Sequence, residues 1–150
     1  MKDEEISSQE QVFDKIHDLR FNYSQNEALE YALQFTEFHD VLMISYTMGE
    51  LAVELDDYEL AIKILSNLID QSYIQENGWF LDCAYILRSY SYAKIGMVAE
   101  ARSDMNQEII QQDEHDDFVD VFWLMNHGNI NTRTIEEILQ TDSNLNQSTR

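Results

Sequence analysis

The sequence predicts an all-α protein of about eight antiparallel helices joined by short turns, and three observations support this prediction. Apolar residues recur every three to four positions through most of the chain, which is the spacing of one face of an α-helix. The four glycines and the absence of proline leave few residues for the tight turns of a many-stranded β protein. With 150 residues, 44% of them apolar, the chain can bury one hydrophobic core. We therefore expect a single helical domain over residues 1–140, followed by a polar tail over 141–150.

Four helices are expected in the first half of the chain, and three of them follow a residue that can cap the start of the helix. Ser7 and Ser24 each stand three residues before a glutamate, the arrangement of a capping box. Asp40 can cap the third helix, and the fourth should begin near Asp57. The apolar pattern breaks over 71–78, which should form the longest internal loop.

Four further helices are expected in the second half. The fifth should span 79–95 and end before Gly96, a residue suited to the left-handed conformation that follows many helices. The sixth should span 97–112 and the seventh 117–126, where Gly128 stops the pattern. A short last helix should run over 132–139.

Small residues recur at a spacing of 40 positions in the central helices. Small side chains let the two helices of a hairpin approach closely, and glycine or aspartate suits the tight turn between them. The recurring pairs are Gly49 and Ser89, Ala61 and Ala101, the turn residues Asp56 and Gly96, and the large apolar residues Leu65 and Met105.

These positions resemble the tetratricopeptide repeat, a pair of antiparallel helices that usually spans 34 residues. Ser45 and Tyr85 stand where the repeat usually has tryptophan, and the usual terminal proline is absent. The resemblance covers about 41–112 and, more weakly, 8–38. It implies antiparallel hairpins stacked as a short solenoid; the alternative is an unrelated helical bundle.

The resemblance also implies that the first helix of each hairpin lines an inner, partner-binding face. Aromatic and acidic side chains on that face would form a groove for a peptide or a protein edge. The residues expected to contact a partner first are Tyr46, Glu50, Glu54 and Tyr90. The other implied positions are Met43, Val53, Cys83, Ile86, Ala93 and Lys94, of which Val53, Ile86 and Ala93 are also candidates for the helix-packing core.

Negative charge is concentrated in two stretches that contain no lysine or arginine. The whole chain carries 29 Asp and Glu against 9 Lys and Arg, a formal charge of −20. Residues 21–62 contribute −9 and residues 103–132 contribute −7, together 16 of the net 20. Such a chain is not expected to bind nucleic acid or an anionic membrane by electrostatics. Its field would instead steer a cationic protein partner, although the same charge also favours solubility.

A run of carboxylates within the second stretch is a further candidate contact for a basic partner. It comprises Asp113, Glu114, Asp116 and Asp117. Carboxylates are ligands for calcium, but the run lacks the glycine and the spaced glutamate of an EF-hand loop. We expect a solvated acidic turn here, with no metal and no cofactor.

The sequence contains no recognisable catalytic motif. It has no glycine-rich phosphate loop, no H-E-x-x-H and no G-x-S-x-G. Cys83 is the only cysteine and lies among apolar residues, so we expect a buried, unreactive thiol and no internal disulfide. The chain is therefore not expected to be an enzyme. The four histidines, none of which is paired at helical spacing with another, are His17, His39, His115 and His127.

The expected location is the cytoplasm, because the acidic start has no signal-peptide pattern and no apolar run approaches a membrane span. In size, acidity and lack of motifs the chain resembles the small immunity proteins of bacterial toxin systems. That resemblance implies stoichiometric neutralisation of a basic toxin. The alternative is a tetratricopeptide-type chaperone of a type III secretion system, which would hold an extended segment of a secreted protein in its groove.

Overall fold

The structure is a computed structural model that describes the backbone over 2–111, 123–124 and 128–148 and the side chains over 8–111 and 128–141. Within these ranges the chain is helical except for short connections and one pair of two-residue strands, so the all-α prediction is confirmed. The elements in chain order are α1 (Lys2–Asn22), α2 (Gln25–Leu33), the 3-10 turn η1 (Thr36–Phe38), α3 (Leu42–Glu54), α4 (Tyr58–Ile74), α5 (Leu81–Lys94), α6 (Val98–Met105), α7 (Glu108–Gln111), β1 (Trp123–Leu124), β2 (Gly128–Asn129) and α9 (Thr132–Ser148).

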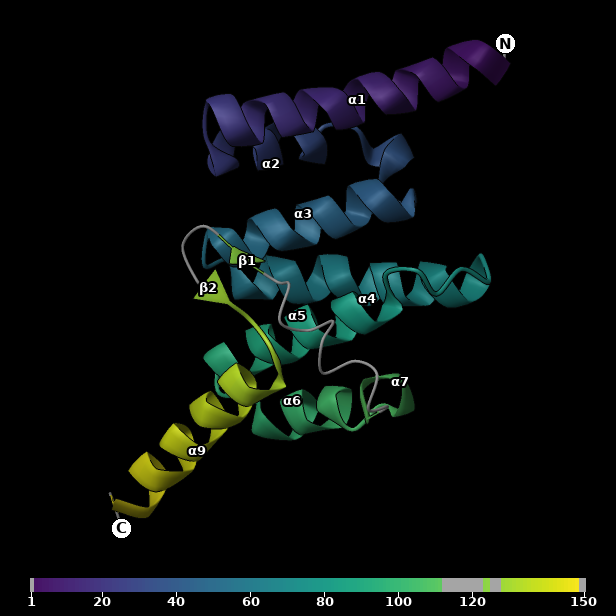
Figure 1. Ribbon diagram of the computed structural model, residues 1–150. Coiled ribbons are helices and arrows are strands. Elements are labelled where there is room, and N and C mark those ends of the chain that lie inside the picture. Colours follow the sequence, from purple (N-terminus) through teal and green to yellow (C-terminus); the bar gives the residue numbers. More distant parts are fainter. Residues whose placement is uncertain (1, 112–122, 125–127, 149–150) are drawn as a thin grey trace.

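The helices are stacked in chain order, and successive helices from α1 to α6 run in opposite directions (Figure 1). Each of these helices packs against the next one in the chain, and α3 also contacts α5. The last helix, α9, packs across α5 and buries Ile135 and Leu139 completely. One contiguous apolar core runs from Val12 in α1 to Leu139 in α9.

Small residues permit the closest approach in both central helix pairs. A Cβ atom added to Gly49 in α3 would lie 2.6 Å from Cδ2 of Leu65 in α4. In the next pair the buried Ser89 of α5 donates a hydrogen bond from Oγ to the carbonyl of Ala101 in α6, at 2.7 Å. Ala61 and Ala101 are both fully buried. The small residues that recur 40 positions apart therefore lie inside the two central helix pairs.

The turns after α3, α4 and α5 share one geometry. Each contains a residue of positive φ: Asp56 at 59°, Glu76 at 52° and Gly96 at 81°. In each turn the next N–H donates to the carbonyl five residues earlier, at 2.9 Å, as in a Schellman motif. The turn signals at Asp56 and Gly96 are thus confirmed, whereas Glu76 carries no such signal in the sequence.

We expect Gly96→Ala to lower the free energy of unfolding by about 1 kcal/mol, because a Cβ is disfavoured at positive φ. The matched control is Gly78→Ala, since Gly78 has no positive φ and its added Cβ would come no closer than 4.0 Å to Leu81. Urea denaturation measures both variants. Equal stability of the two variants would contradict the strain argument.

One of the three predicted N-terminal caps is confirmed, since Ser24 Oγ accepts a hydrogen bond from the Glu27 N–H at 3.1 Å. Asp57, near which the fourth helix was expected to begin, also caps its helix by accepting a hydrogen bond from the Leu60 N–H at 3.3 Å. The other two predicted caps, Ser7 and Asp40, were wrong. The helix α1 begins at Lys2, so its start lies ahead of Ser7, and α3 is preceded directly by Val41 rather than by Asp40.

Helix ends in the second half also differ from the predictions. The helix α4 continues to Ile74, so the expected loop is confined to residues 75–80. The expected helix over 97–112 breaks after Met105 and resumes as α7 at Glu108. The sequence carries no signal for this break, because residues 106–107 include neither glycine nor proline.

The predicted helix over 117–126 is wrong at residues 123–124, which form β1 and pair antiparallel with β2. The rest of that range lies outside the described residues. The last helix does not end at Leu139, because α9 continues to Ser148 through most of the expected polar tail. Its start is capped by Asn131, whose Oδ1 accepts from the Thr134 N–H at 2.9 Å.

Candidate functional site

An ion pair joins α1 to α3 at Glu50, one of the predicted partner-binding residues. Arg20 Nη1 lies 3.1 Å from Glu50 Oε1, and the Tyr46 hydroxyl donates to Glu50 Oε2 at 3.3 Å. The Arg20 and Glu50 side chains are only 9% and 18% exposed. Tyr46 in turn stacks on Phe80, with ring centroids 5.1 Å apart. The structure therefore brings together Tyr46 and Glu50, two of the predicted contact residues. The Glu50 carboxylate, however, is already paired with Arg20.

Aromatic side chains along α1 border this ion pair. Phe13, His17 and Phe21 follow one another at one-turn spacing, with centroid distances of 4.4 Å and 5.7 Å. The Arg20 guanidinium lies 5.5 Å from the Phe21 ring centroid. Burial, followed by the positive charge of Arg20, lowers the pKa of His17 and favours its neutral form. The Arg20–Glu50 ion pair was not predicted from the sequence, because the two residues are 30 positions apart in the chain.

Glu54 and Tyr90 are buried, with only 3% and 5% of their surface exposed. The Tyr90 ring packs edge-on against Tyr58, with centroids 6.1 Å apart. Lys94 Nζ lies 5.9 Å from the centre of the Tyr90 ring. In this conformation Glu54 and Tyr90 therefore offer little area to a partner, and their role in binding stays a prediction.

The remaining predicted contacts, Asp113, Glu114, Asp116 and Asp117, lie outside the described residues. Among the residues whose placement is described, no group of three or more His, Cys, Asp or Glu side chains could hold a metal ion. Over the same part of the chain, no helix combines the length and the apolar character needed to cross a membrane.

Cys83 is buried at 8% exposure. Burial, then the nearby Asp82 carboxylate, raises the pKa of its thiol well above the usual value. Because the thiolate is the nucleophile, a raised pKa opposes the reactivity that covalent catalysis needs. The geometry supports the expectation of a structural thiol.

We expect Cys83 to react with a disulfide reagent such as DTNB at least tenfold more slowly in the folded protein than in 6 M guanidinium chloride at pH 8. Both the low exposure and the raised pKa act in this direction. The absorbance of the released thiol reports the two rates. A native rate equal to the denatured one would show that the thiol is accessible and ionisable.

Some of the predicted surface charge is internal. Asp104, counted in the second acidic stretch, is 4% exposed and pairs with Arg88 through two hydrogen bonds of 2.7 Å and 2.8 Å. Glu50 and Glu54 of the first stretch are also withdrawn from the surface. These three carboxylates, counted among the charges of the two acidic stretches, therefore do not belong to the exposed negative surface.

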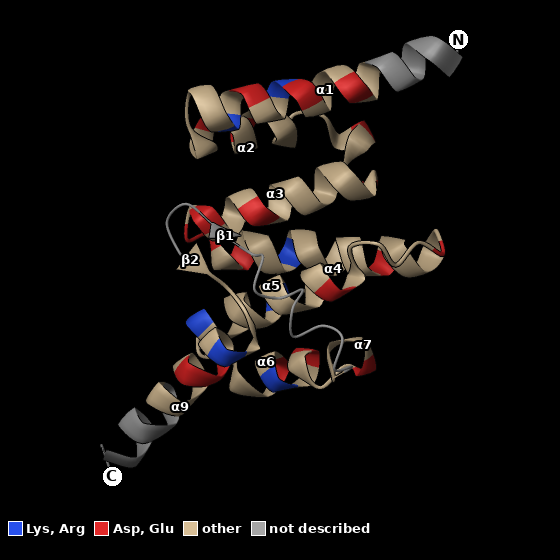
Figure 2. Ribbon diagram, in the orientation of Figure 1, with Lys and Arg blue, Asp and Glu red and all other residues tan. Residues whose placement is uncertain are grey.

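The first acidic stretch nevertheless keeps most of its charge on the surface. Seven of its nine carboxylates are exposed: Glu27, Glu30, Glu37, Asp40, Asp56, Asp57 and Glu59. Asp and Glu outnumber Lys and Arg over the described helices (Figure 2). Of the seven Lys and Arg with described side chains, four form ion pairs within the protein: Lys15 with Asp18, Arg20 with Glu50, Arg88 with Asp104 and Arg102 with Glu136.

Comparison with known proteins adds no further constraint. No protein-family model matches the chain, and neither the curated proteins nor the solved structures contain a match.

Proposed function

We propose that this chain is a non-catalytic protein-binding module, an immunity protein that neutralises a basic bacterial toxin by stoichiometric binding in the cytoplasm. The observation that carries the proposal is the set of seven exposed carboxylates between residues 21 and 62, a stretch without any lysine or arginine. Most of the described cations are meanwhile held in ion pairs within the protein. These exposed carboxylates would present a negative surface to a positively charged partner.

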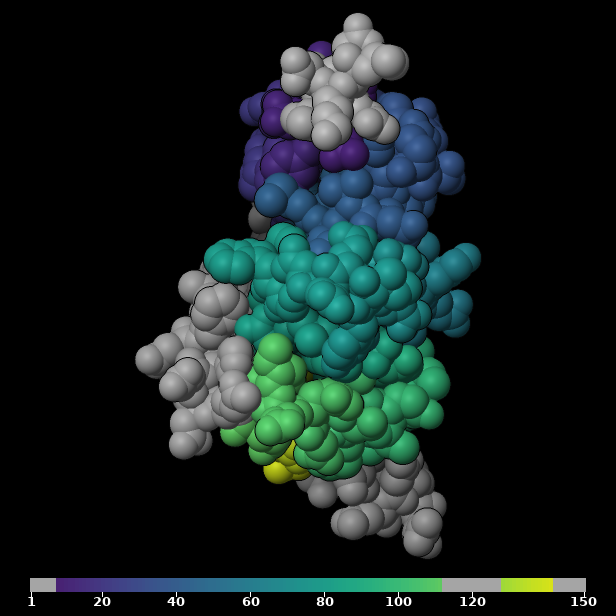
Figure 3. All heavy atoms as spheres, turned by 90° about the vertical axis from the view of Figure 1, so that its right-hand side faces the viewer, coloured from purple at the N-terminus to yellow at the C-terminus, as the bar shows by residue number. Residues whose placement is uncertain are grey.

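The proposed architecture is a short tetratricopeptide-like solenoid. Three features support it: the layering of the helices in chain order (Figure 3), the equivalent small residues at Gly49 and Ser89, and the equivalent turns at Asp56 and Gly96. In such a stack, α9 would cover the apolar surface that α5 and α6 leave at the end.

The exposed charges would act mainly on the rate of association. Individual exposed ion pairs contribute only about 0.2–1 kcal/mol, and salt screens them. A field of one sign instead raises the rate at which an oppositely charged protein arrives. Affinity must then come from apolar contact, as in interfaces where a few buried anchors carry most of the energy.

The proposal is tested by capturing the partner from the native host, identifying it and titrating its activity with this protein. We expect a basic partner whose activity disappears at one equivalent, with the same end point after long incubation. Substoichiometric inactivation would indicate turnover and contradict the proposal. An acidic partner would contradict its electrostatic part.

The second candidate is a chaperone of type III secretion, and the aromatic lining near Tyr46 and Phe80 favours it. A chaperone would bind an extended segment, whereas an immunity protein would bind a folded toxin domain. Hydrogen exchange of the captured partner separates the two: protection confined to one unstructured segment indicates a chaperone.

A further inference from the structure

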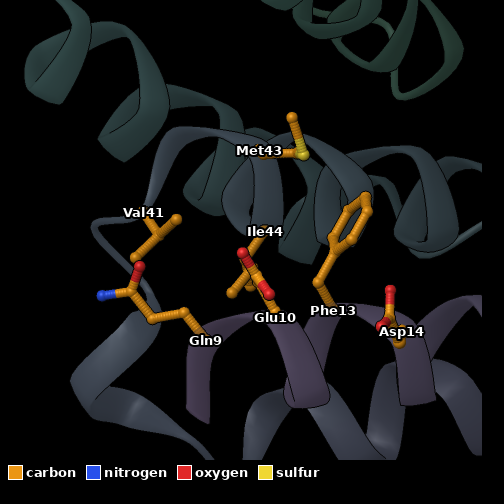
Figure 4. A pocket seen from close by; sticks show the side chains of 7 residues that line it. All are labelled: Gln9, Glu10, Phe13, Asp14, Val41, Met43 and Ile44. Carbon is orange, nitrogen blue, oxygen red and sulfur yellow. The ribbon is translucent and has the colours of Figure 1, made fainter. Parts of the chain in front are cut away.

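A groove of about 310 Å³ opens between α1 and the start of α3 (Figure 4). Its apolar walls are formed by Phe13 from α1 and by Val41, Met43 and Ile44 from the other side. Phe13 and Ile44 pack into the core, whereas Met43 is 48% exposed. The part of the groove formed by Phe13 and Ile44 is therefore fixed by the core, and Met43 is the apolar lining side chain whose replacement should disturb the fold least.

Two carboxylates border this apolar surface on the α1 side. Glu10 and Asp14 both line the groove and are exposed, and they stand four residues apart on one face of the helix. Residues at that spacing are neighbours on the helix surface. The groove thus combines an apolar floor with a pair of negative charges one turn apart.

We propose that this groove is the docking site for an amphipathic helical segment of the basic partner, one that presents leucine or isoleucine beside lysine or arginine. The inference rests on the proposed function and adds the chemistry of the contact. Charge complementarity selects the occupant, because Glu10 and Asp14 would pair with cations that flank the inserted side chain. A cationic segment without an apolar anchor would leave the groove unfilled.

The size of the groove fits one or two aliphatic side chains. An apolar cavity of about 150 Å³ holds a benzene molecule, so 310 Å³ accommodates a leucine with a second side chain one turn away. Burying a leucine-sized side chain strengthens binding by roughly ten- to a hundredfold. That gain is larger than the gain from a single exposed ion pair.

The test uses two synthetic 16-residue helical peptides that carry the same four lysines. One presents two leucines at i and i+4 between the lysines, and the other has alanine at those two positions. Fluorescence anisotropy at 150 mM NaCl measures the binding of each peptide. We expect the leucine peptide to bind the wild-type protein at least tenfold more tightly than the alanine peptide.

Met43→Lys and Met97→Lys form a matched pair of variants. Both methionines are exposed, at 48% and 39%, and both changes add the same charge, but only Met43 lines the groove. We expect Met43→Lys to abolish the preference for the leucine peptide and Met97→Lys to keep it. Equal effects of the two variants, or equal binding of the two peptides, would overturn the inference.

Neutralising the rim gives a second test that leaves the apolar packing intact. Glu10→Gln with Asp14→Asn should weaken the leucine peptide several-fold more than Glu76→Gln with Glu100→Gln, which removes the same charge from exposed sites outside the groove. If the two pairs of changes weaken binding equally, the attraction depends only on the net charge of the protein, and the inference is overturned.

The captured partner separates this inference from the proposed function. If a basic partner is neutralised at one equivalent and Met43→Lys binds it as tightly as wild type, the groove assignment fails while the proposed function stands. If the partner is acidic, the electrostatic part of the proposed function fails, whatever the two peptides do.

Discussion

Replacing Asp104 with alanine is expected to lower the free energy of unfolding by about 3–5 kcal/mol, the usual effect of removing one partner of a buried ion pair. The Asp104 carboxylate is 4% exposed and accepts two hydrogen bonds from Arg88. Arg88 Nη1 also donates to Ser66, so this guanidinium connects α4, α5 and α6. Without Asp104, the positive charge of Arg88 would remain largely buried with no countercharge. Urea denaturation of the two proteins measures the difference.

The matched control for this prediction is Glu136→Ala. It breaks the ion pair between Arg102 Nη1 and Glu136 Oε1, which lie 3.2 Å apart. The two side chains are 45% and 40% exposed. An exposed pair of this kind contributes about 0–1 kcal/mol. Comparable losses for Asp104→Ala and Glu136→Ala would show that the Arg88 pair does not hold these helices together. A double change of Arg88→Met with Asp104→Leu should recover much of the lost stability.

The second large effect is expected where α3 meets α4. Gly49→Val should lower the free energy of unfolding by about 1–3 kcal/mol through overpacking, because even a Cβ at this position lies 2.6 Å from Leu65 Cδ2. Leu65 is fully buried, and Leu65→Ala alone should lower it by about 2–5 kcal/mol by leaving a cavity. The double variant should lose less than the sum, because the valine methyl groups enter the space that Leu65 leaves.

Ala99→Val is the control for a β-branched side chain in a helix without overpacking, since Ala99 is an exposed position within α6. Helix propensity cannot explain a loss at Gly49, because valine is more favourable than glycine in a helix interior. Valine should lower stability there by at most about 0.7 kcal/mol. If Gly49→Val falls within that range, or if its effect adds fully to that of Leu65→Ala, the helices are not in the close contact that the structure shows.

Most helices could be predicted from the sequence because their cores require apolar residues at helical spacing. Boundaries were predicted where a local interaction decides them, as in the side-chain cap at Ser24 and the left-handed turn at Gly96. Ser7 misled the prediction because serine is tolerated inside a helix and the pattern N-terminal to it is polar. The strand at 123–124 depends on pairing with β2, which apolar periodicity does not report.

The site was less predictable because its polar contacts link residues far apart in the chain. Tyr46 and Glu50 could be named through the resemblance to the tetratricopeptide repeat, but the Arg20 that pairs with Glu50 comes from another helix, α1. Charge counting likewise treated Asp104 as surface charge, because the pairing with Arg88 appears only when α5 and α6 pack together. The groove has the same origin, since its two walls come from α1 and the start of α3.

The most direct test of electrostatic attraction to a basic partner is the association rate constant, measured by stopped flow at 50 mM and 200 mM NaCl. The seven exposed carboxylates of residues 21–62 should steer a cationic protein, and salt should screen that field. We predict that the rate constant falls about tenfold or more over this range, while the dissociation rate changes much less. An association rate that is indifferent to salt would contradict the account.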